Sequence, residues 1–259
     1  TQRRVGVGYP LLVTFAHPVK RKGATERRLE VKVDGKPIKG AWSWRDSYTA
    51  QYRPRKGFWP GKSTIKLTAT LRNSVLAVDR KPNGKPAREW KGGQKSDRVI
   101  KIKTARSFIA YIRDARHVMI VKKNGKPVYH PIPVSLGKPG FATRSGIKVA
   151  TEKYYVKRMV NTELDYDVQS PFSVRITPTG EFIHGAPWAT GRLGRYDGSH
   201  GCTNLGVSDA KWYYDHVIYG DPVVTTGTGR PMEWTNGLGG PWNIPWRDWL
   251  ARSALKGKA

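Results

Sequence analysis

Residues 29–35 read Leu-Glu-Val-Lys-Val-Asp-Gly, which places apolar side chains at every second position ahead of an Asp-Gly turn. The same alternation recurs at residues 65–71 and 100–103. A period of two buries one face of a β-strand, and Gly and Pro residues separate these runs without an intervening helical pattern. The sequence therefore predicts that residues 1–104 form an immunoglobulin-like β-sandwich.

Three tryptophans in this first segment bear on its role: Trp42, Trp44 and Trp59. Exposed indole rings can stack on carbohydrate, but large aromatic side chains of a sandwich belong more often to its core. We therefore expect all three rings to be buried.

A second β-rich pattern begins near Thr104 and runs through an Asn124-Gly125 turn. It continues to a segment with helical spacing, for which Ser208 is the expected N-cap and Asp209 the acidic residue of the first turn. Gly220 is expected to end this helix. The pattern predicts a second domain that is mainly β with one clear helix.

The end of the chain is rich in tryptophan. Pro245 can begin a short helix in which Trp246, Trp249 and Leu250 share a face at positions i, i+3 and i+4. We therefore divide the chain after the sandwich into a second domain and a C-terminal extension. The second domain spans residues 105–230, and residues 231–259 are expected to pack on it.

The chain of 259 residues carries a formal net charge of +28, from 47 Lys and Arg against 19 Asp and Glu. A field of this sign attracts nucleic acid, anionic lipid and anionic cell-envelope polymers alike. The basic residues are dispersed rather than gathered in a tail or helix stripe, so nucleic acid is not the expected partner. An aromatic content of 11% argues against a disordered polycation, and no apolar run reaches the roughly 20 residues of a membrane span.

The one cysteine of the sequence, Cys202, lies in the turn-like stretch Ser199-His200-Gly201-Cys202-Thr203-Asn204. A single thiol excludes an intrachain disulfide and a cysteine-rich metal cluster. A reactive thiol needs an imidazole or a positive field nearby, and His184 and His200 are candidates. An inert thiol between structural histidines, or a metal site of these three residues, are the alternatives, although no second ligand pair is present.

His184 followed by Ser199-His200-Gly201-Cys202-Thr203-Asn204 resembles the signature of the L,D-transpeptidases, the YkuD-type enzymes of the bacterial cell wall. The similarity to actinobacterial members extends from about Phe108 to Trp249. In that group an immunoglobulin-type sandwich commonly precedes the catalytic domain. The resemblance therefore implies the same two-domain organisation as the strand pattern.

The resemblance also implies roles for individual residues. Cys202 would be the nucleophile and His184 its base, held by the backbone carbonyl of Gly185, where some relatives have serine. The N–H groups of Gly201 and Cys202, with the Tyr166 hydroxyl, would form the oxyanion hole. The residues expected to contact the substrate are Tyr166, Met159, Trp188, Ser199, His200 and Asn204.

The reaction implied by the resemblance is acyl transfer between peptidoglycan stem peptides through a cysteine thioester, which gives 3→3 cross-links. Water as the acceptor would give L,D-carboxypeptidase activity. No metal or organic cofactor is implied. The expected partners are stem peptides, anionic envelope polymers and, as inhibitors, carbapenem β-lactams.

The expected location is extracytoplasmic, in the cell wall or periplasmic space, with a membrane anchor on the full-length precursor. Two other readings stay open at this point. One is a cysteine peptidase of the papain or sortase type, and the other is a non-catalytic module that binds polyanions or cell wall. The order of His184 before Cys202 and the Ser-His-Gly-Cys context favour the transpeptidase over both.

Overall fold

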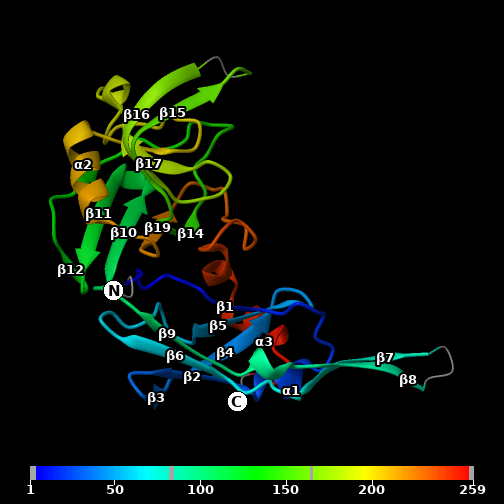
Figure 1. The fold of residues 1–259 in the computed structure, drawn as a ribbon. Coiled ribbons are helices and arrows are strands. Elements are labelled where there is room, and N and C mark those ends of the chain that lie inside the picture. Colours follow the sequence, from blue (N-terminus) through cyan, green and yellow to red (C-terminus); the bar gives the residue numbers. More distant parts are fainter. Residues whose placement is uncertain (1–3, 82–84, 164–165, 257–259) are drawn as a thin grey trace. The chain divides into compact units, whose positions relative to one another are not determined.

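The computed structural model describes residues 4–81, 85–163 and 166–256. The described chain divides into two compact units (Figure 1). The first unit comprises Pro10–Ala105 and the described chain from Ile244 onward; the second comprises Val5–Tyr9 and Arg106–Asn243. Strands predominate over helices in both units, which confirms the predicted mainly β fold class.

Antiparallel strands build the first unit. They are β1 (Leu11–Thr14), β2 (Leu29–Val33), β3 (Lys36–Pro37), β4 (Gly40–Trp44), β5 (Thr49–Pro54), β6 (Thr64–Ala69), β7 (Val75–Arg80), β8 (Pro86–Lys91) and β9 (Arg98–Lys103). One sheet has the order β1-β5-β4, another β3-β2-β6-β9, and β7 pairs with β8. Such antiparallel sheets agree with the predicted immunoglobulin-like sandwich. The short helices described in this unit are α1 (Lys22–Glu26), the 3₁₀ turn η1 (Gln94–Ser96) and α3 (Trp246–Ala251).

Trp42, Trp44 and Trp59 are buried in the first unit, which confirms the expectation that they belong to its core. The alternation at residues 100–103 is a strand, β9, but its apolar face is not covered: Ile100 keeps 46% of its surface exposed. β9 is the last strand in the order of its sheet. An edge strand has a neighbour on one side only, so period two alone does not ensure burial.

The C-terminal segment corrects one expectation. Residues 231–243 belong to the second unit, but the chain from Ile244 belongs to the first, not to the catalytic-type domain on which we expected it to pack. The indole N–H of Trp249, in helix α3 (Trp246–Ala251), donates to the Ala41 carbonyl at 3.0 Å. The buried carboxylate of Glu26 accepts hydrogen bonds from three groups, the Ser253 hydroxyl and the N–H groups of Ala254 and Leu255. Buried partners for these polar groups, which the sequence pattern does not reveal, decide where the segment docks.

The second unit contains two sheets. Its strands are β10 (Phe108–Arg113), β11 (Val118–Lys123), β12 (Lys126–Pro127), β13 (Ile132–Pro133), β14 (Gly146–Val149), β15 (Lys153–Asn161), β16 (Tyr166–Arg175), β17 (Phe182–Gly185), β18 (Thr203–Leu205) and β19 (Pro222–Thr226). One sheet has the order β12-β11-β10-β19-β14, with β13 on β11, and the other β15-β16-β17-β18. The 3₁₀ turns are η2 (Asp114–Arg116), η3 (Pro187–Ala189) and η4 (Gly240–Asn243).

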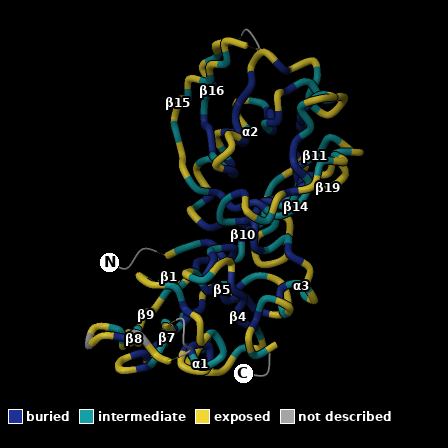
Figure 2. Tube along the Cα trace, turned by 90° about the vertical axis from the view of Figure 1, so that its right-hand side faces the viewer, coloured by how far each residue is buried: buried dark blue, intermediate teal, exposed yellow. Residues whose placement is uncertain are grey.

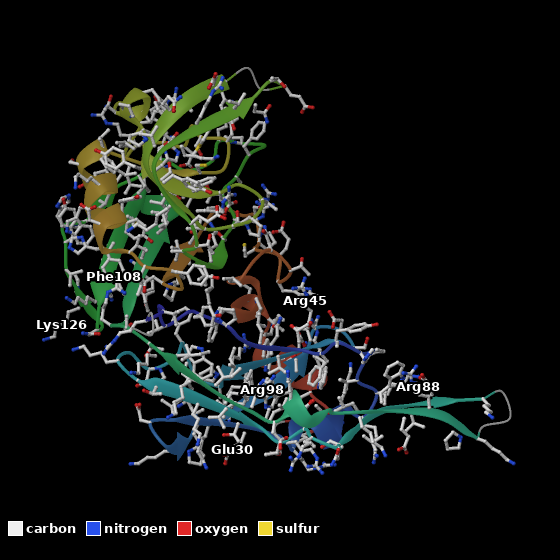
Figure 3. The ribbon with its side chains drawn as sticks, in the orientation of Figure 1. Glu30, Arg45, Arg88, Arg98, Phe108 and Lys126 are labelled. Atoms are coloured by element: carbon white, nitrogen blue, oxygen red, sulfur yellow. The ribbon has the colours of Figure 1, made fainter. Side chains whose placement is uncertain are left out.

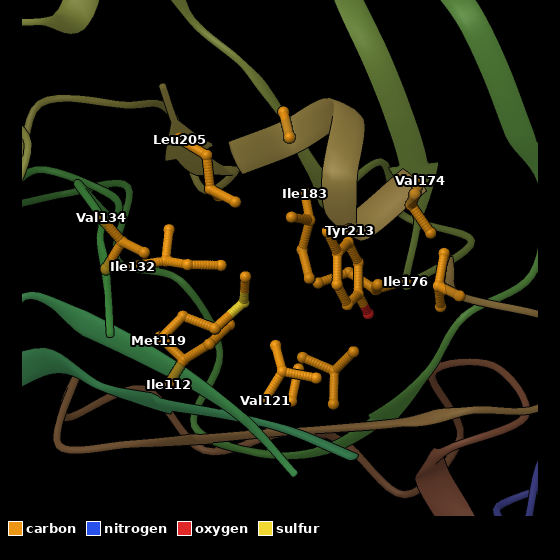
Figure 4. Close-up of a cluster of buried hydrophobic side chains, with 14 of the residues drawn as sticks. Ile112, Met119, Val121, Ile132, Val134, Val174, Ile176, Ile183, Leu205 and Tyr213 are labelled. Atoms are coloured by element: carbon orange, nitrogen blue, oxygen red, sulfur yellow. The ribbon is translucent and has the colours of Figure 1, made fainter. Parts of the chain in front are cut away.

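The core of the second unit fills the space between these strands and helix α2 (Val207–His216). Met119 from β11, Ile183 from β17 and Tyr213 from α2 gather there with other buried apolar side chains (Figure 4). Ile183 and Leu205 are fully buried in the two strands that carry the chemistry-bearing residues. This packing fixes the backbone on which those residues lie.

Helix α2 lies where the sequence predicts it, with two differences at its ends. Its N-cap is Gly206 rather than Ser208, and no side chain caps it. Asp209 does lie in the first turn, as expected. The helix ends at His216, ahead of Gly220, because the backbone turns to an extended conformation at Val217.

Cationic side chains cover the surface of both units. Arg45, Arg88, Arg98 and Lys126, labelled in Figure 3, are exposed. The dispersion of basic residues in the sequence is therefore also a dispersion over the surface. Among the described residues, no helix is long and apolar enough to cross a membrane.

Candidate active site

A cavity of about 700 Å³ opens in the second unit. Strands β15 and β16 form one wall, and most of β15 is exposed or half-buried (Figure 2). The rest of the lining comes from β17, the turn before it and the loop before β18, together with Phe141 and Asn204. The predicted site residues that line it are Met159, Tyr166, His184, Trp188, Ser199, His200, Cys202 and Asn204.

Cys202 lies at the end of a tight turn that leads into β18. Gly201 adopts a φ of 118°, a conformation that residues with a side chain rarely adopt. The Ser199 hydroxyl donates to the Cys202 carbonyl at 2.6 Å and accepts from the Gly201 N–H at 3.1 Å. Thr143 donates to the Gly201 carbonyl at 3.0 Å. The polar residues of this stretch therefore hold the turn that presents the thiol.

His184 lies on the strand next to that turn. β17 and β18 pair in parallel, with Ile183 opposite Thr203 and His184 opposite Asn204. This register brings the backbone of His184 beside the strand that begins directly after Cys202. The parallel pairing of two short strands thus joins residues that lie far apart in the sequence.

The imidazole of His184 has a defined tautomer. Its Nδ1 lies 2.9 Å from the carbonyl oxygen of Gly185. A carbonyl only accepts, so Nδ1 carries the hydrogen, and Nε2 of the neutral ring is left as the proton acceptor. Burial lowers the pKa of His184 to about 4, so the ring is neutral at pH 7.

The thiol of Cys202 is also neutral at rest. Burial raises its pKa to about 11, and the backbone N–H of Phe182 acts in the opposite direction. The sulfur donates to the Gly180 carbonyl at 3.7 Å. The residue is half-buried at the wall of the cavity. Both side chains are therefore neutral at rest, and a neutral thiol needs a base to remove its proton before or during attack.

A buried ionic network lies behind the thiol, and no pattern in the sequence indicated it. Lys148 is fully buried, and its Nζ lies 3.0 Å from Glu181 Oε2. The other oxygen of Glu181 accepts from the backbone N–H and the guanidinium of Arg144, both at 3.0 Å. Glu181 lies between Gly180 and Phe182, whose backbones contact the sulfur. The network therefore fixes the segment against which the thiol rests.

The oxyanion-hole candidates are not all free. The Gly201 N–H is engaged by Ser199, as described above, so it must exchange that partner to bind an oxyanion. Tyr166 stacks on His200 with ring centroids 5.1 Å apart and an interplanar angle of 16°. Phe141 contacts the same imidazole edge-on at 4.9 Å. His200 is thus held between two aromatic rings on the cavity wall.

Trp188 and Met159 border the cavity from different elements. Trp188 lies in η3, keeps 45% of its surface exposed, and its ring lies 6.0 Å from that of His184. Met159 faces Val168 across the β15–β16 hairpin. Sequence reasoning missed Lys157 and Arg192, which also line the cavity. Abundant basic residues elsewhere in the chain gave no reason to single them out.

Metal binding at Cys202 finds no support in the ligand geometry. Within the described part of the chain, the residues that could hold a metal ion together are Asp114, His117 and Asp197. None of these three lines the cavity. Cys202 and His184 both line the cavity.

Comparison with known proteins identifies the two domains of the chain. Residues 107–225 match the family model of the L,D-transpeptidase catalytic domain (YkuD), and residues 1–74 match that of a bacterial Ig domain. The chain is therefore of the class in which an L,D-transpeptidase catalytic domain of the YkuD family follows a bacterial Ig domain in the sequence.

Within that class, the chain is homologous to the mycobacterial L,D-transpeptidases. It is 30% identical to L,D-transpeptidase 5 of Mycobacterium tuberculosis strain H37Rv over 97% of this chain and 54% of the relative. It is 31% identical to L,D-transpeptidase 2 of Mycobacterium tuberculosis strain CDC 1551 over 96% of this chain and 60% of the relative. The chain thus spans little more than half the length of these curated relatives.

A solved L,D-transpeptidase in complex with imipenem has a similar structure. It superposes with a TM-score of 0.67 at 26% identity, covering 87% of this chain and 94% of the other. Because the superposition covers 87% of this chain, the similarity includes both the sandwich and the second domain.

Proposed function

We propose that this chain forms 3→3 cross-links between peptidoglycan stem peptides as an L,D-transpeptidase. The observation that carries the proposal is the placement of Cys202 and His184 in one cavity: His184 lies in β17, and Cys202 directly precedes β18, the parallel neighbour of β17. The tautomer of His184 supports it, because Nε2 is left to accept a proton. The homology to mycobacterial L,D-transpeptidases supplies the reaction class.

The first half-reaction releases the terminal residue of the donor stem. Cys202 Sγ attacks the carbonyl carbon at the L-centre of the diamino acid, and His184 Nε2 takes the thiol proton. The C–N bond to the terminal D-Ala then breaks, and the imidazolium returns the proton to the departing amine. A thioester between Cys202 and the donor stem remains.

The second half-reaction transfers the acyl group. The side-chain amine of a second stem attacks the thioester carbonyl, His184 Nε2 takes a proton from that amine, and the Cys202 sulfur leaves and is reprotonated. Water in place of the amine gives hydrolysis, the L,D-carboxypeptidase side reaction. In each half-reaction, His184 first accepts a proton from the nucleophile and then returns a proton to the leaving group.

The negative charge that develops on the carbonyl oxygen during attack must be stabilised by hydrogen-bond donors. We assign this role to the N–H groups of Cys202 and Gly201 and to the Tyr166 hydroxyl. Gly201 becomes available when its hydrogen bond to Ser199 opens. Met159, Trp188, Ser199, His200 and Asn204, which border the cavity, are assigned to substrate contact.

The partners follow from the reaction. A related L,D-transpeptidase was solved with imipenem, so we propose that carbapenems acylate Cys202 in this chain as well. A peptidoglycan substrate places the protein outside the cytoplasm. The dispersed positive charge would favour association with anionic envelope polymers. The membrane anchor expected on a full-length precursor stays a prediction.

The test uses a donor tetrapeptide stem and an acceptor stem with a free side-chain amine. Mass spectrometry of the products should show loss of D-Ala and a dimer joined through the position-three residues. The Cys202→Ala variant should form neither. Release of D-Ala without any dimer, at saturating acceptor, would reduce the proposed function to carboxypeptidase activity.

A further inference from the structure

Arg192 is a cation in the cavity that the proposed reaction does not use. It lies in the loop between η3 and the turn of Cys202, and its side chain lines the same cavity as the thiol. Within residues 4–81, 85–163 and 166–256, no carboxylate lies within ion-pair distance of its guanidinium. A half-buried guanidinium without a counter-ion, at the wall of a cavity, is available to bind an anionic ligand.

The other arginines of the cavity differ in this respect. Arg158 forms a two-point ion pair with Asp167, with contacts of 2.9 and 2.6 Å. Arg175 donates to Glu152 at 2.6 Å. Their charges are thus already compensated by carboxylates of the protein, whereas that of Arg192 is not.

The loop holds the Arg192 side chain in place. Nη1 donates to the Gly198 carbonyl at 3.1 Å. A Cβ at position 198 would lie 2.7 Å from both Cδ and Nη1 of Arg192, so the guanidinium fits only because residue 198 has no side chain. One of the five N–H donors is used in this contact, and the others remain for a ligand. Gly198 directly precedes Ser199, so this cradle adjoins the nucleophile turn.

We propose that Arg192 binds a carboxylate of the donor stem peptide and makes this chain prefer stems whose carboxylates are free over stems in which they are amides. The inference rests on the proposed function and adds a specificity to it. A planar guanidinium binds a carboxylate through two parallel hydrogen bonds, and a neutral amide cannot replace that charge. Lys157, on the opposite wall, adds positive charge without an ion pair among the described residues.

Two carboxylates of a donor stem could fill this role, the C-terminal carboxylate and the second carboxylate of the diamino acid. The experiment therefore uses three donor stems: one with both groups free, one amidated at the C-terminus and one amidated at the diamino acid. Donor turnover is measured as kcat/KM for D-Ala or D-alaninamide release. The amidation that lowers kcat/KM in the wild type identifies the carboxylate that Arg192 binds.

Three variants probe the cradle. Arg192→Gln removes the charge, and Gly198→Ala retains the charge but displaces the guanidinium. Arg195→Gln is the matched control, since Arg195 is an exposed cation of the same loop that does not line the cavity. Alkylation of Cys202 by iodoacetamide, which is neutral, checks in each variant that the thiol and its surroundings are intact.

The wild type should favour the free donor by roughly 10- to 100-fold over one of the amides, as expected for a hydrogen-bonded charge pair. Arg192→Gln and Gly198→Ala should bring that ratio close to one, with unchanged alkylation, and Arg195→Gln should keep it. A wild-type ratio near one, or a ratio that persists in Arg192→Gln, would overturn the inference while leaving transpeptidation intact. Absence of turnover with all three donors would instead contradict the proposed function.

Discussion

The Nδ1 atom of His184 lies 2.9 Å from the carbonyl oxygen of Gly185, the next residue in the chain. This single contact sets the tautomer of the imidazole and its orientation without a side-chain carboxylate. A backbone carbonyl is uncharged, so it orients the ring without raising its pKa as much as an acid would. The imidazole is therefore neutral at pH 7, which suits the proposed role of accepting the thiol proton during attack.

Loss of this base should slow acylation sharply. His184→Ala is expected to reduce the rate of Cys202 acylation by about 10²- to 10⁴-fold, because the thiol then has no proton acceptor. His200→Ala, which removes a ring held between Tyr166 and Phe141, should have a smaller effect. Stopped-flow or mass-resolved acylation rates compare the two variants, and a greater loss in His200→Ala would show that the base is misassigned.

The pH dependence of stability should carry the signature of a buried neutral histidine. The folded-state pKa of His184 is about 4, below the unfolded value of about 6.5. The unfolded chain therefore binds more protons between these values, so the contribution to stability is complete above pH of about 6.5 and is lost as pH falls toward 4.

The matching measurement compares urea unfolding of the second unit at pH 7.5 and pH 5. The wild type should lose on the order of 2 kcal/mol more than His184→Gln over this interval. Equal losses in the two proteins would mean that the imidazole is not held neutral by burial.

The ion pair behind the thiol should be costly to break. Glu181→Gln leaves the buried ammonium of Lys148 without a carboxylate, which should lower the free energy of unfolding by about 3–5 kcal/mol. Glu233→Gln is the control, since its side chain is 47% exposed and its pair with Arg144 should be worth about 1 kcal/mol or less. Denaturant unfolding measures both, and similar losses would contradict the assigned difference in burial.

The catalytic unit should be acylated without the sandwich. A fragment of residues 106–243 retains every residue assigned to the reaction and the core around Ile183 and Leu205. It lacks the hydrogen bonds that Gly6 and Gly8 donate to Tyr219 and Gly220, so a lower melting temperature is expected. Intact-mass analysis after incubation with a carbapenem checks the fragment. A soluble, folded fragment that takes up no carbapenem would refute this division of labour.

Much of the fold could be predicted because the alternation of apolar and polar residues in strands such as residues 29–33 indicates which face is buried. The sequence also singled out Cys202, since a thiol in a glycine-rich polar turn is unusual for a core cysteine. It left His184 and His200 as candidate partners, and the family resemblance chose His184, which lines the same cavity. Long-range polar partners were not accessible in this way. Lys148 and Glu181 form an ion pair in the interior, and Glu26 accepts hydrogen bonds from the C-terminal segment. Lys and Glu are residue types that normally lie at the surface, so the sequence alone does not mark these positions as buried.

The central claim is that Cys202 forms the acyl-enzyme, and intact-mass measurement after incubation with imipenem tests it most directly. The wild type should gain the mass of one imipenem, because opening of the β-lactam ring by the thiolate adds the whole molecule. Cys202→Ala should keep its original mass, with an unchanged circular dichroism spectrum. An adduct of the same mass on Cys202→Ala, or an unmodified wild type after prolonged incubation, would contradict the account.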